Sequence, residues 1–454
     1  MSRAYGRCGW PSALTATRWY VTAMIVAVPL WWALGVEQFA YPLLLLPALL
    51  ALLVTKRRVH FSPVLVALLL FMVVYLASAL FIVEDDRYLT FLKNLATYVS
   101  AAILLVVVPG VTRTWSDIRA MVVALAIAMA LAGLVGVLAI TGLLRGPFSS
   151  PFGALLPASV AATALGSNIV ERSLGWMSWF AAFGSYFRVN SVFLWPTSYG
   201  SALALTIPIV AFVAATSQLR RLRLVWWAIA VILVVNLVFT TARMAALALC
   251  AAAVIWYLGT RLRTKWRTRV VASALGVVVV GLAVLAEPAL LDVPQVVEQT
   301  VFARGSGSPT SRWTIYERTL EGFVERPILG WGTERNIAGV ADTFIYPAGS
   351  HSYYLATLYR QGVLGFLAFV ALWWVTWQAT SQRRVPVGAP EQARAFVAVG
   401  RAVVVAALIM ATTLAFDLDA SLMLVWWCLV SLLVAVGTID EAPSSSAVLE
   451  ARRA

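Results

Sequence analysis

Long apolar runs set the strongest limit on what this chain can fold into. They recur in blocks of about 17–25 residues, the length that a helix needs to cross the hydrocarbon core of a bilayer. The chain is 61% hydrophobic and only 12% charged, whereas soluble domains carry roughly 25% charged residues. A soluble fold of this composition would have too few polar side chains to cover its surface. The sequence therefore predicts an all-α polytopic membrane protein.

The apolar blocks define about twelve transmembrane helices and one integral membrane domain, residues 1–454. The predicted spans are residues 19–36, 39–54, 62–83, 94–110, 118–141, 191–216, 223–240, 243–258, 270–287, 352–378, 401–416 and 421–437.

The basic residues give these spans a direction. Lys and Arg concentrate in alternate short loops, for example at residues 56–58, 220–223, 261–269 and 383–384. Cytoplasmic loops carry such an excess of positive charge, so these loops and both termini are expected in the cytoplasm. The net charge of +14 then reflects membrane topology, and no nucleic-acid partner is expected.

Two longer segments fall on the opposite, outer side. Residues 142–190 open with a Gly/Pro/Ser-rich stretch and are predicted to lie in the membrane interface as short helices. Residues 288–351 form the largest outer loop. Within it, residues 311–325 repeat apolar side chains at helical spacing and predict an amphipathic helix. Residues 440–454 are predicted to be a disordered cytoplasmic tail.

The chain has only two histidines. His60 follows a basic cluster on the cytoplasmic side and is interpreted as a surface residue. His351 closes the large outer loop, immediately before a predicted span. Histidine can exchange a proton near neutral pH, so His351 is either an acid–base group or an interfacial residue that marks the end of a helix.

Three arginines share the outer side with His351. Arg188 precedes the sixth predicted span, Arg243 opens the eighth, and Arg312 begins the loop helix. An arginine at a membrane boundary often extends to the lipid headgroups, but its forked guanidinium also binds phosphate with two parallel hydrogen bonds. Two or more such groups near a histidine would suit a lipid-linked pyrophosphate.

Sequence signatures of metal and cofactor sites are absent. There is no HExxH motif, no Cys/His cluster, no P-loop and no Rossmann fingerprint. Asp417 and Asp419 form a DxD string between the last two predicted spans, and we interpret it as a polar turn rather than a metal site. Neither a metal ion nor a cofactor is predicted.

The outer motifs resemble those of the O-antigen ligase and polymerase superfamily. The similarity covers roughly residues 185–370, in an order that matches the family. The matching elements are Arg188 with Asn190, Pro196 and Gly200; Thr240–Arg243; Ser311-Arg312-Trp313; the turn Pro327–Gly332; Asn336; His351–Leu355; and the Gly362–Gly365 step.

This resemblance implies a membrane glycosyltransferase of the GT-C type, located in the bacterial cytoplasmic membrane. Such enzymes take a glycan from undecaprenyl pyrophosphate on the outer face and join it to an acceptor hydroxyl, without a metal ion. The acceptor could be a glycan, a lipid or a cell-wall polymer. By this similarity Arg188 and Arg243 bind the pyrophosphate, Arg312 is a further candidate for that site, and His351 is the general base. The stereochemistry expected is inversion.

The sequence departs from the family at two places. Many relatives have Asn after the histidine, where this chain has Ser352. Many have Glu two residues before the Gly-x-x-Gly step, where this chain has Arg360 and Gln361. These positions bear on the acceptor and the subfamily.

A glycan ligase is the leading hypothesis, and a polymerase that joins repeat units on their carrier is the close alternative. A transporter or flippase of lipid-linked glycans is less well supported, because transporters usually carry polar residues at the membrane midplane. A structural scaffold gives no reason for Arg188, Arg243 and His351 to share one face.

Overall fold

The computed structural model describes residues 13–55, 60–84, 87–144, 146–180, 184–259, 308–335 and 347–439. The predicted span at 270–287 and the predicted tail at 440–454 lie outside the described residues. So does a large part of the predicted outer loop.

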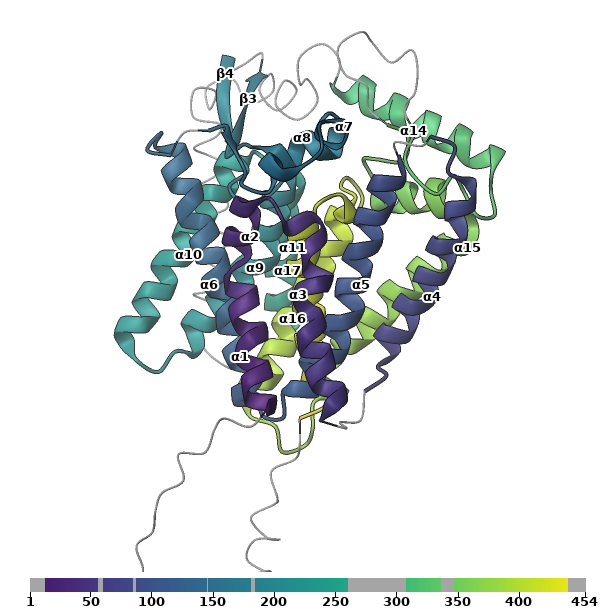
Figure 1. Ribbon diagram of the computed structural model, residues 1–454. Helices are drawn as coiled ribbons and strands as arrows, with labels where there is room; N and C mark the ends of the chain where they lie inside the picture. Colours follow the sequence, from purple (N-terminus) through teal and green to yellow (C-terminus); the bar gives the residue numbers. More distant parts are fainter. Residues whose placement is uncertain are drawn as a thin grey trace, which may run out of the picture.

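Most of the described chain is a bundle of apolar helices (Figure 1). Eight described helices are long and apolar enough to cross a membrane, and the bent pair α1–α2 makes a ninth. With the shorter helices α11 and α17, these elements occupy eleven of the twelve predicted spans. The bundle helices are α1 (Ala13–Val26), α2 (Val28–Leu34), α3 (Glu37–Val54), α4 (Pro63–Ser78), α5 (Arg87–Val111), α6 (Trp115–Ile140), α9 (Pro196–Thr216), α10 (Arg220–Thr240), α11 (Arg243–Gly259), α15 (Tyr353–Ala379), α16 (Glu391–Met410) and α17 (Ala420–Val436).

Helices α9 and α17 form the centre of the bundle. Every residue of α17 is buried, and α9 is buried on all sides over most of its length. Helices that are hydrophobic all round take such interior positions. The other helices expose one apolar face, for example Leu43, Val73 and Leu134, as expected where a helix faces lipid.

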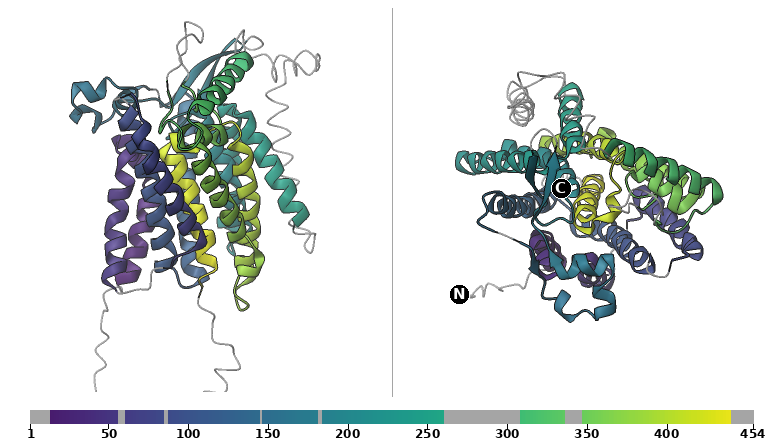
Figure 2. Two further views of the ribbon diagram at one scale, coloured as in Figure 1. Left: turned by 90° about the vertical axis from the view of Figure 1, so that its right-hand side faces the viewer. Right: turned by 90° about the horizontal axis from the view of Figure 1, so that it is seen from above.

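One end of the bundle carries a cap of small elements, and we call it the outer end (Figures 1 and 2). Residues 142–190 contain the expected short helices but also strands that the sequence analysis did not predict. The elements there are β1 (Phe148–Ser149), η2 (Gly153–Leu155), α7 (Ala158–Ala161), α8 (Ala164–Val170), β2 (Glu171–Arg172), β3 (Gly175–Phe180) and β4 (Gly184–Val189).

The strands form two small antiparallel sheets, β1–β2 and β3–β4. In β3 the sequence Gly-Trp-Met-Ser-Trp-Phe is rich in the aromatic residues that favour strands. An all-α description therefore holds for the bundle and fails for this part of the cap. The predicted loop helix is confirmed as α14 (Ser308–Glu325), which begins three residues earlier than expected.

Two basic loops, at residues 220–223 and 383–384, lie at the opposite end of the bundle from the cap, and the basic stretches at 56–58 and 261–269 lie outside the described residues. Helix α10 begins there at Arg220, and α15 leads there to Arg383 and Arg384 in the 3-10 helix η5 (Gln382–Arg384). Helix α1 begins and α17 finishes at this same end (Figure 1). The two described basic loops therefore lie at one end of the bundle, on the same side as the start of α1 and the end of α17.

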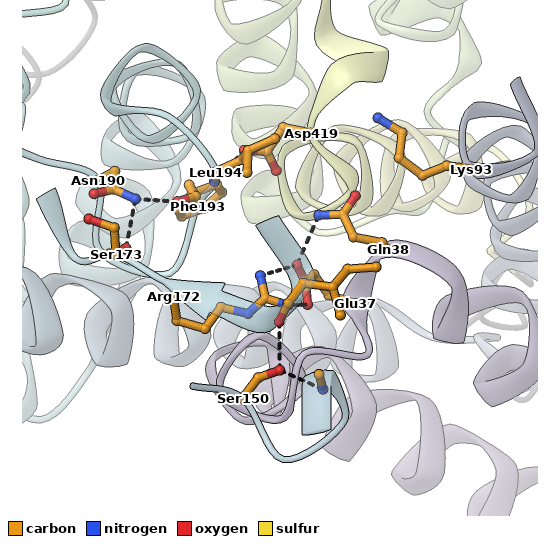
Figure 3. Close-up of polar contacts among 12 residues, drawn as sticks. Glu37, Gln38, Lys93, Ser150, Arg172, Ser173, Asn190, Phe193, Leu194 and Asp419 are labelled. Atoms are coloured by element: carbon orange, nitrogen blue, oxygen red, sulfur yellow. Dashed lines mark hydrogen bonds and ion pairs between the residues drawn. The ribbon is translucent and has the colours of Figure 1, made fainter. Parts of the chain in front are cut away.

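A buried ion pair fastens the cap to the bundle (Figure 3). Arg172 of β2 donates from both terminal nitrogens to the carboxylate of Glu37 at the start of α3, at 2.8 and 2.9 Å. Both side chains are only 2% exposed. Gln38 donates to the same carboxylate at 2.9 Å, and the Arg172 guanidinium lies 5.8 Å from the centre of the Trp32 ring.

We predict that Arg172→Met will lower the free energy of unfolding by about 3–5 kcal/mol, because it leaves the Glu37 carboxylate buried without its counter-charge. The double substitution Arg172→Met with Glu37→Leu removes both charges and is expected to be less destabilising. Thermal unfolding of the purified protein in detergent measures both effects.

The exposed pair Arg318–Glu321, with side chains 54% and 59% exposed, provides the control. Arg318→Met should change stability by less than about 1 kcal/mol. Equal effects of Arg172→Met and Arg318→Met would contradict a fastening role for the buried pair.

Candidate functional site

The tight hairpin between α10 and α11 places Arg243 at the outer end. Thr241 takes a left-handed conformation with φ of 52°, which ends α10 and reverses the chain. The Thr240 hydroxyl accepts a hydrogen bond from the amide of Ala242 at 3.2 Å. Gly200 of α9 lies against this hairpin, where a Cβ atom would overlap Ala242. Arg243 is the first residue of α11 and is partly exposed.

Arg188 reaches the same hairpin from the cap. It lies on β4, opposite Trp176 of β3. Its Nε donates a hydrogen bond to the carbonyl oxygen of Thr240 at 3.1 Å, three residues before Arg243. The fold therefore bonds Arg188 to the hairpin that carries Arg243, although the two residues are far apart in the sequence. Their predicted role in one anion site stays a prediction.

The end of β4 is held by polar contacts of Asn190, which Figure 3 shows, and by a contact to α6. The Asn190 amide nitrogen donates to the carbonyl oxygens of Ser173 and Phe193, at 3.0 and 2.6 Å. Ser191, with φ of 48°, donates its hydroxyl to the carbonyl oxygen of Ala132 on α6 at 2.6 Å. These bonds fix the strand that carries Arg188.

His351 lies at the outer end just before α15. Its Nδ1 is 3.3 Å from the hydroxyl oxygen of Ser350. Ser352 caps the helix by accepting from the amide of Leu355 at 3.4 Å. The family's Asn is thus replaced by a residue that serves as a good helix N-cap.

Helix α14 docks beside His351. The amide of Gly349 donates to the hydroxyl of Thr319 on α14 at 2.9 Å, and α14 packs along α15. Arg312 belongs to α14, but its side chain lies outside the described part of the structure. Its predicted role at the anion site therefore stays a prediction.

Helix α16 connects the histidine to the arginine hairpin. Its outer end accepts two hydrogen bonds from the start of α15: Tyr353 N to Ala411 O at 2.8 Å, and the Tyr354 hydroxyl to Leu408 O at 2.9 Å. On another side, α16 packs against α11, which begins at Arg243. His351, Arg188 and Arg243 therefore share one end of the bundle on elements that are joined through α16.

The turn at residues 417–419 uses its carboxylates in protein contacts. Asp417 binds Arg360, and Asp419 accepts from the amides of Leu422 and Leu194, at 3.0 and 2.8 Å. Burial raises the pKa of the Asp419 carboxyl, which these two amides partly offset. Among the described residues, no group of three or more His, Cys, Asp or Glu side chains could hold a metal ion.

Comparison with known families adds to this geometry. Residues 228–370 match the family model described as O-antigen ligase. The matched segment covers less than half of the chain and is similar to the O-antigen ligase family. It runs from α10 into α15 and contains Arg243, Arg312 and His351, whereas Arg188 precedes it. The resemblance predicted from the motifs is confirmed over these residues. No curated protein matches the chain.

Two motifs of the O-antigen ligase segment meet at a break in α15. Gly362 has φ of 65° and ψ of −166°, which interrupts the helix. The amides of Trp331 and Gly332 donate to the carbonyl oxygens of Tyr359 and Arg360, at 3.1 and 2.7 Å.

On the far side of the break, the amides of Val363 and Leu364 donate to the carbonyl oxygens of Pro327 and Ile328, at 2.8 and 3.3 Å. The turn Pro327–Gly332 thus provides the hydrogen-bond partners that the broken helix loses. A break in a membrane helix is tolerated when its freed backbone groups are satisfied in this way.

We predict that Gly362→Ala will lower the free energy of unfolding by about 2–3 kcal/mol, because a side chain is strained at this φ and its Cβ would overlap the backbone of Ile328. Gly388→Ala is the control, since a Cβ there meets no atom within 4 Å. Thermal unfolding of both variants tests this, and equal stabilities would show that the break does not need glycine.

Proposed function

We propose that this protein is a membrane glycosyltransferase that transfers a glycan from undecaprenyl pyrophosphate to an acceptor hydroxyl at the outer end of the bundle. One observation carries the proposal: Arg188 is bonded to the hairpin that presents Arg243. His351 lies at the same end, within the O-antigen ligase segment. The family match supports a glycosyltransferase-type enzyme in general, and the donor and acceptor are our inference.

The proposed reaction is a single displacement at the anomeric carbon. The acceptor oxygen forms a bond to C1 of the donor sugar while the bond from C1 to the pyrophosphate oxygen breaks. His351 takes the proton of the acceptor hydroxyl. The electron pair of the broken bond stays on undecaprenyl pyrophosphate, and the configuration at C1 inverts.

The two arginines would stabilise the charge that grows on the leaving pyrophosphate. Their guanidinium groups stay protonated and offer planar pairs of donors that suit phosphate oxygens. Positive groups fixed in advance where charge develops make one of the largest contributions to catalysis. Arg188 and Arg243 would thereby supply the positive charge that a divalent cation supplies in other phosphate-transfer sites.

The bundle suits a donor that is anchored in the membrane. Apolar helix faces meet the lipid, and the partly exposed Arg243 lies at the outer end of α11. A polyprenyl chain would stay in the bilayer while its pyrophosphate reaches the arginines. We propose that the outer end faces away from the cytoplasm of a bacterial cell, because the described basic loops, at residues 220–223 and 383–384, lie at the opposite end. Both termini would then be cytoplasmic.

We predict that His351→Ala will reduce glycan transfer by about 10²–10⁴-fold, the usual contribution of a general base. Arg243→Ala should reduce transfer by about 10²–10³-fold, as for loss of a transition-state donor. Arg243→Lys should recover only part of this, because an ammonium cannot form the forked pair. Transfer is measured with purified protein, carrier-linked glycan and acceptor.

His60→Ala serves as the matched control, because His60 is exposed at the basic end of the bundle. It should transfer at the wild-type rate. If His351→Ala and Arg243→Ala also transferred at that rate while correctly folded, the proposed roles would be wrong.

A repeat-unit polymerase is the second candidate, because the O-antigen ligase family match is compatible with either acceptor. In the polymerase the acceptor would be another repeat unit on its own carrier. Incubating the protein with carrier-linked repeat units alone separates the two. A ladder of carrier-linked oligomers would identify a polymerase, and transfer that requires a second, carrier-free acceptor would identify a ligase.

A further inference from the structure

The outer two turns of α15 form a unit distinct from the rest of that helix. They run from Tyr353 to Gln361 and end where Gly362 breaks the helix. His351 stands two residues before the unit begins. The position of the His351 backbone therefore depends on what holds these two turns on one side and, on the other, on the hydrogen bond of Gly349 to Thr319 of α14.

A buried ion pair holds the inner end of this unit. The terminal nitrogens of Arg360 donate to the two carboxylate oxygens of Asp417, at 3.0 and 3.2 Å. The Nε of Arg360 donates to the carbonyl oxygen of Ala356, one turn earlier, at 3.2 Å. Both side chains of the pair are 2% exposed. The Arg360 guanidinium is thus hydrogen-bonded both to its own helix and to the turn before α17.

A chain of two tyrosines holds the other end of the unit to the same carboxylate. The Tyr98 hydroxyl on α5 donates to Asp417 Oδ2 at 3.0 Å. The Tyr353 hydroxyl lies 3.0 Å from the Tyr98 oxygen. Since the Tyr98 proton is directed to Asp417, Tyr353 donates to Tyr98. Asp417 is therefore the common anchor for the first and the eighth residue of the unit.

We propose that the Arg360–Asp417 pair, with Tyr98, positions His351 for proton transfer. The pair does so by fixing where residues 353–361 lie along the axis of α15 and how they are rotated about it. Asp417 and Arg360 are positioning residues that act through α15. The inference rests on the proposed role of His351 as the base.

The first variant removes both charges, Arg360→Met with Asp417→Leu, because a single substitution would leave one charge buried and could prevent folding. The second, Tyr98→Phe, removes only the hydroxyl that links Tyr353 to Asp417. The control is Gln361→Met, which alters a residue equally buried on the same helical turn, 2% exposed, and leaves the ion pair intact.

Two measurements are made on each variant. The first is the rate at which diethyl pyrocarbonate modifies His351, in a His60→Gln background where His351 is the only histidine. The second is the kinetics of glycan transfer. A shift of about 1 Å in a reacting group can lower the rate roughly a hundredfold. We therefore expect kcat to fall about tenfold to a hundredfold in the double variant and less in Tyr98→Phe, with little change in the KM for the donor.

The modification rate should change severalfold in the double variant and in Tyr98→Phe, and should match the wild type in Gln361→Met. An unchanged modification rate in both test variants would overturn the positioning proposal, whatever the reaction proves to be. If the double variant does not fold, the modification rate of Tyr98→Phe alone tests the positioning proposal. A changed modification rate with wild-type transfer would support the positioning of His351 and reject His351 as the base.

Discussion

A charge buried in this apolar bundle needs a polar partner, and two ion pairs meet this need at the outer end. Arg172 with Glu37 joins the cap to α3, and Arg360 with Asp417 joins α15 to the turn before α17. Both are bidentate and buried. An uncompensated charge in such surroundings is expensive, so each pair specifies one arrangement of the segments it connects. The first contributes to holding the cap that carries Arg188, and the second anchors the turns that follow His351.

The same requirement applies to the backbone at the break in α15. Four main-chain hydrogen bonds to the turn at residues 327–332 replace those that Gly362 interrupts. The turn also joins α14 to the bundle, since the Trp331 indole donates to the carbonyl oxygen of Gly322 on α14 at 2.7 Å. The loop helix, the break and the histidine therefore form one connected structure. This explains physically why the Pro327–Gly332 turn and the Gly362–Gly365 step occur together in the sequence.

The candidate site residues were predicted from their side-chain chemistry and from the order of the motifs along the chain. The outer placement of Arg188, Arg243 and His351 was predicted from apolar block lengths and loop charge, and the bundle places all three at one end. The resemblance to O-antigen ligases was confirmed for residues 228–370. The partners of Arg360 and Arg172 were not predicted. A signal was present, because a charge within an apolar segment needs a partner, but Asp417 and Glu37 are 57 and 135 residues away along the chain. Only packing could select them.

By itself, the sequence determined that the chain is a bundle of apolar helices, which loops carry positive charge, and which residues are candidates for a functional site. It could do so because helix length, hydropathy and loop charge are local properties. The tertiary structure decided that Arg188 bonds to the hairpin of Arg243, that strands build part of the cap, and that Gly362 separates the outer turns of α15 from the rest. These features depend on contacts between distant segments, and no local pattern encodes such contacts.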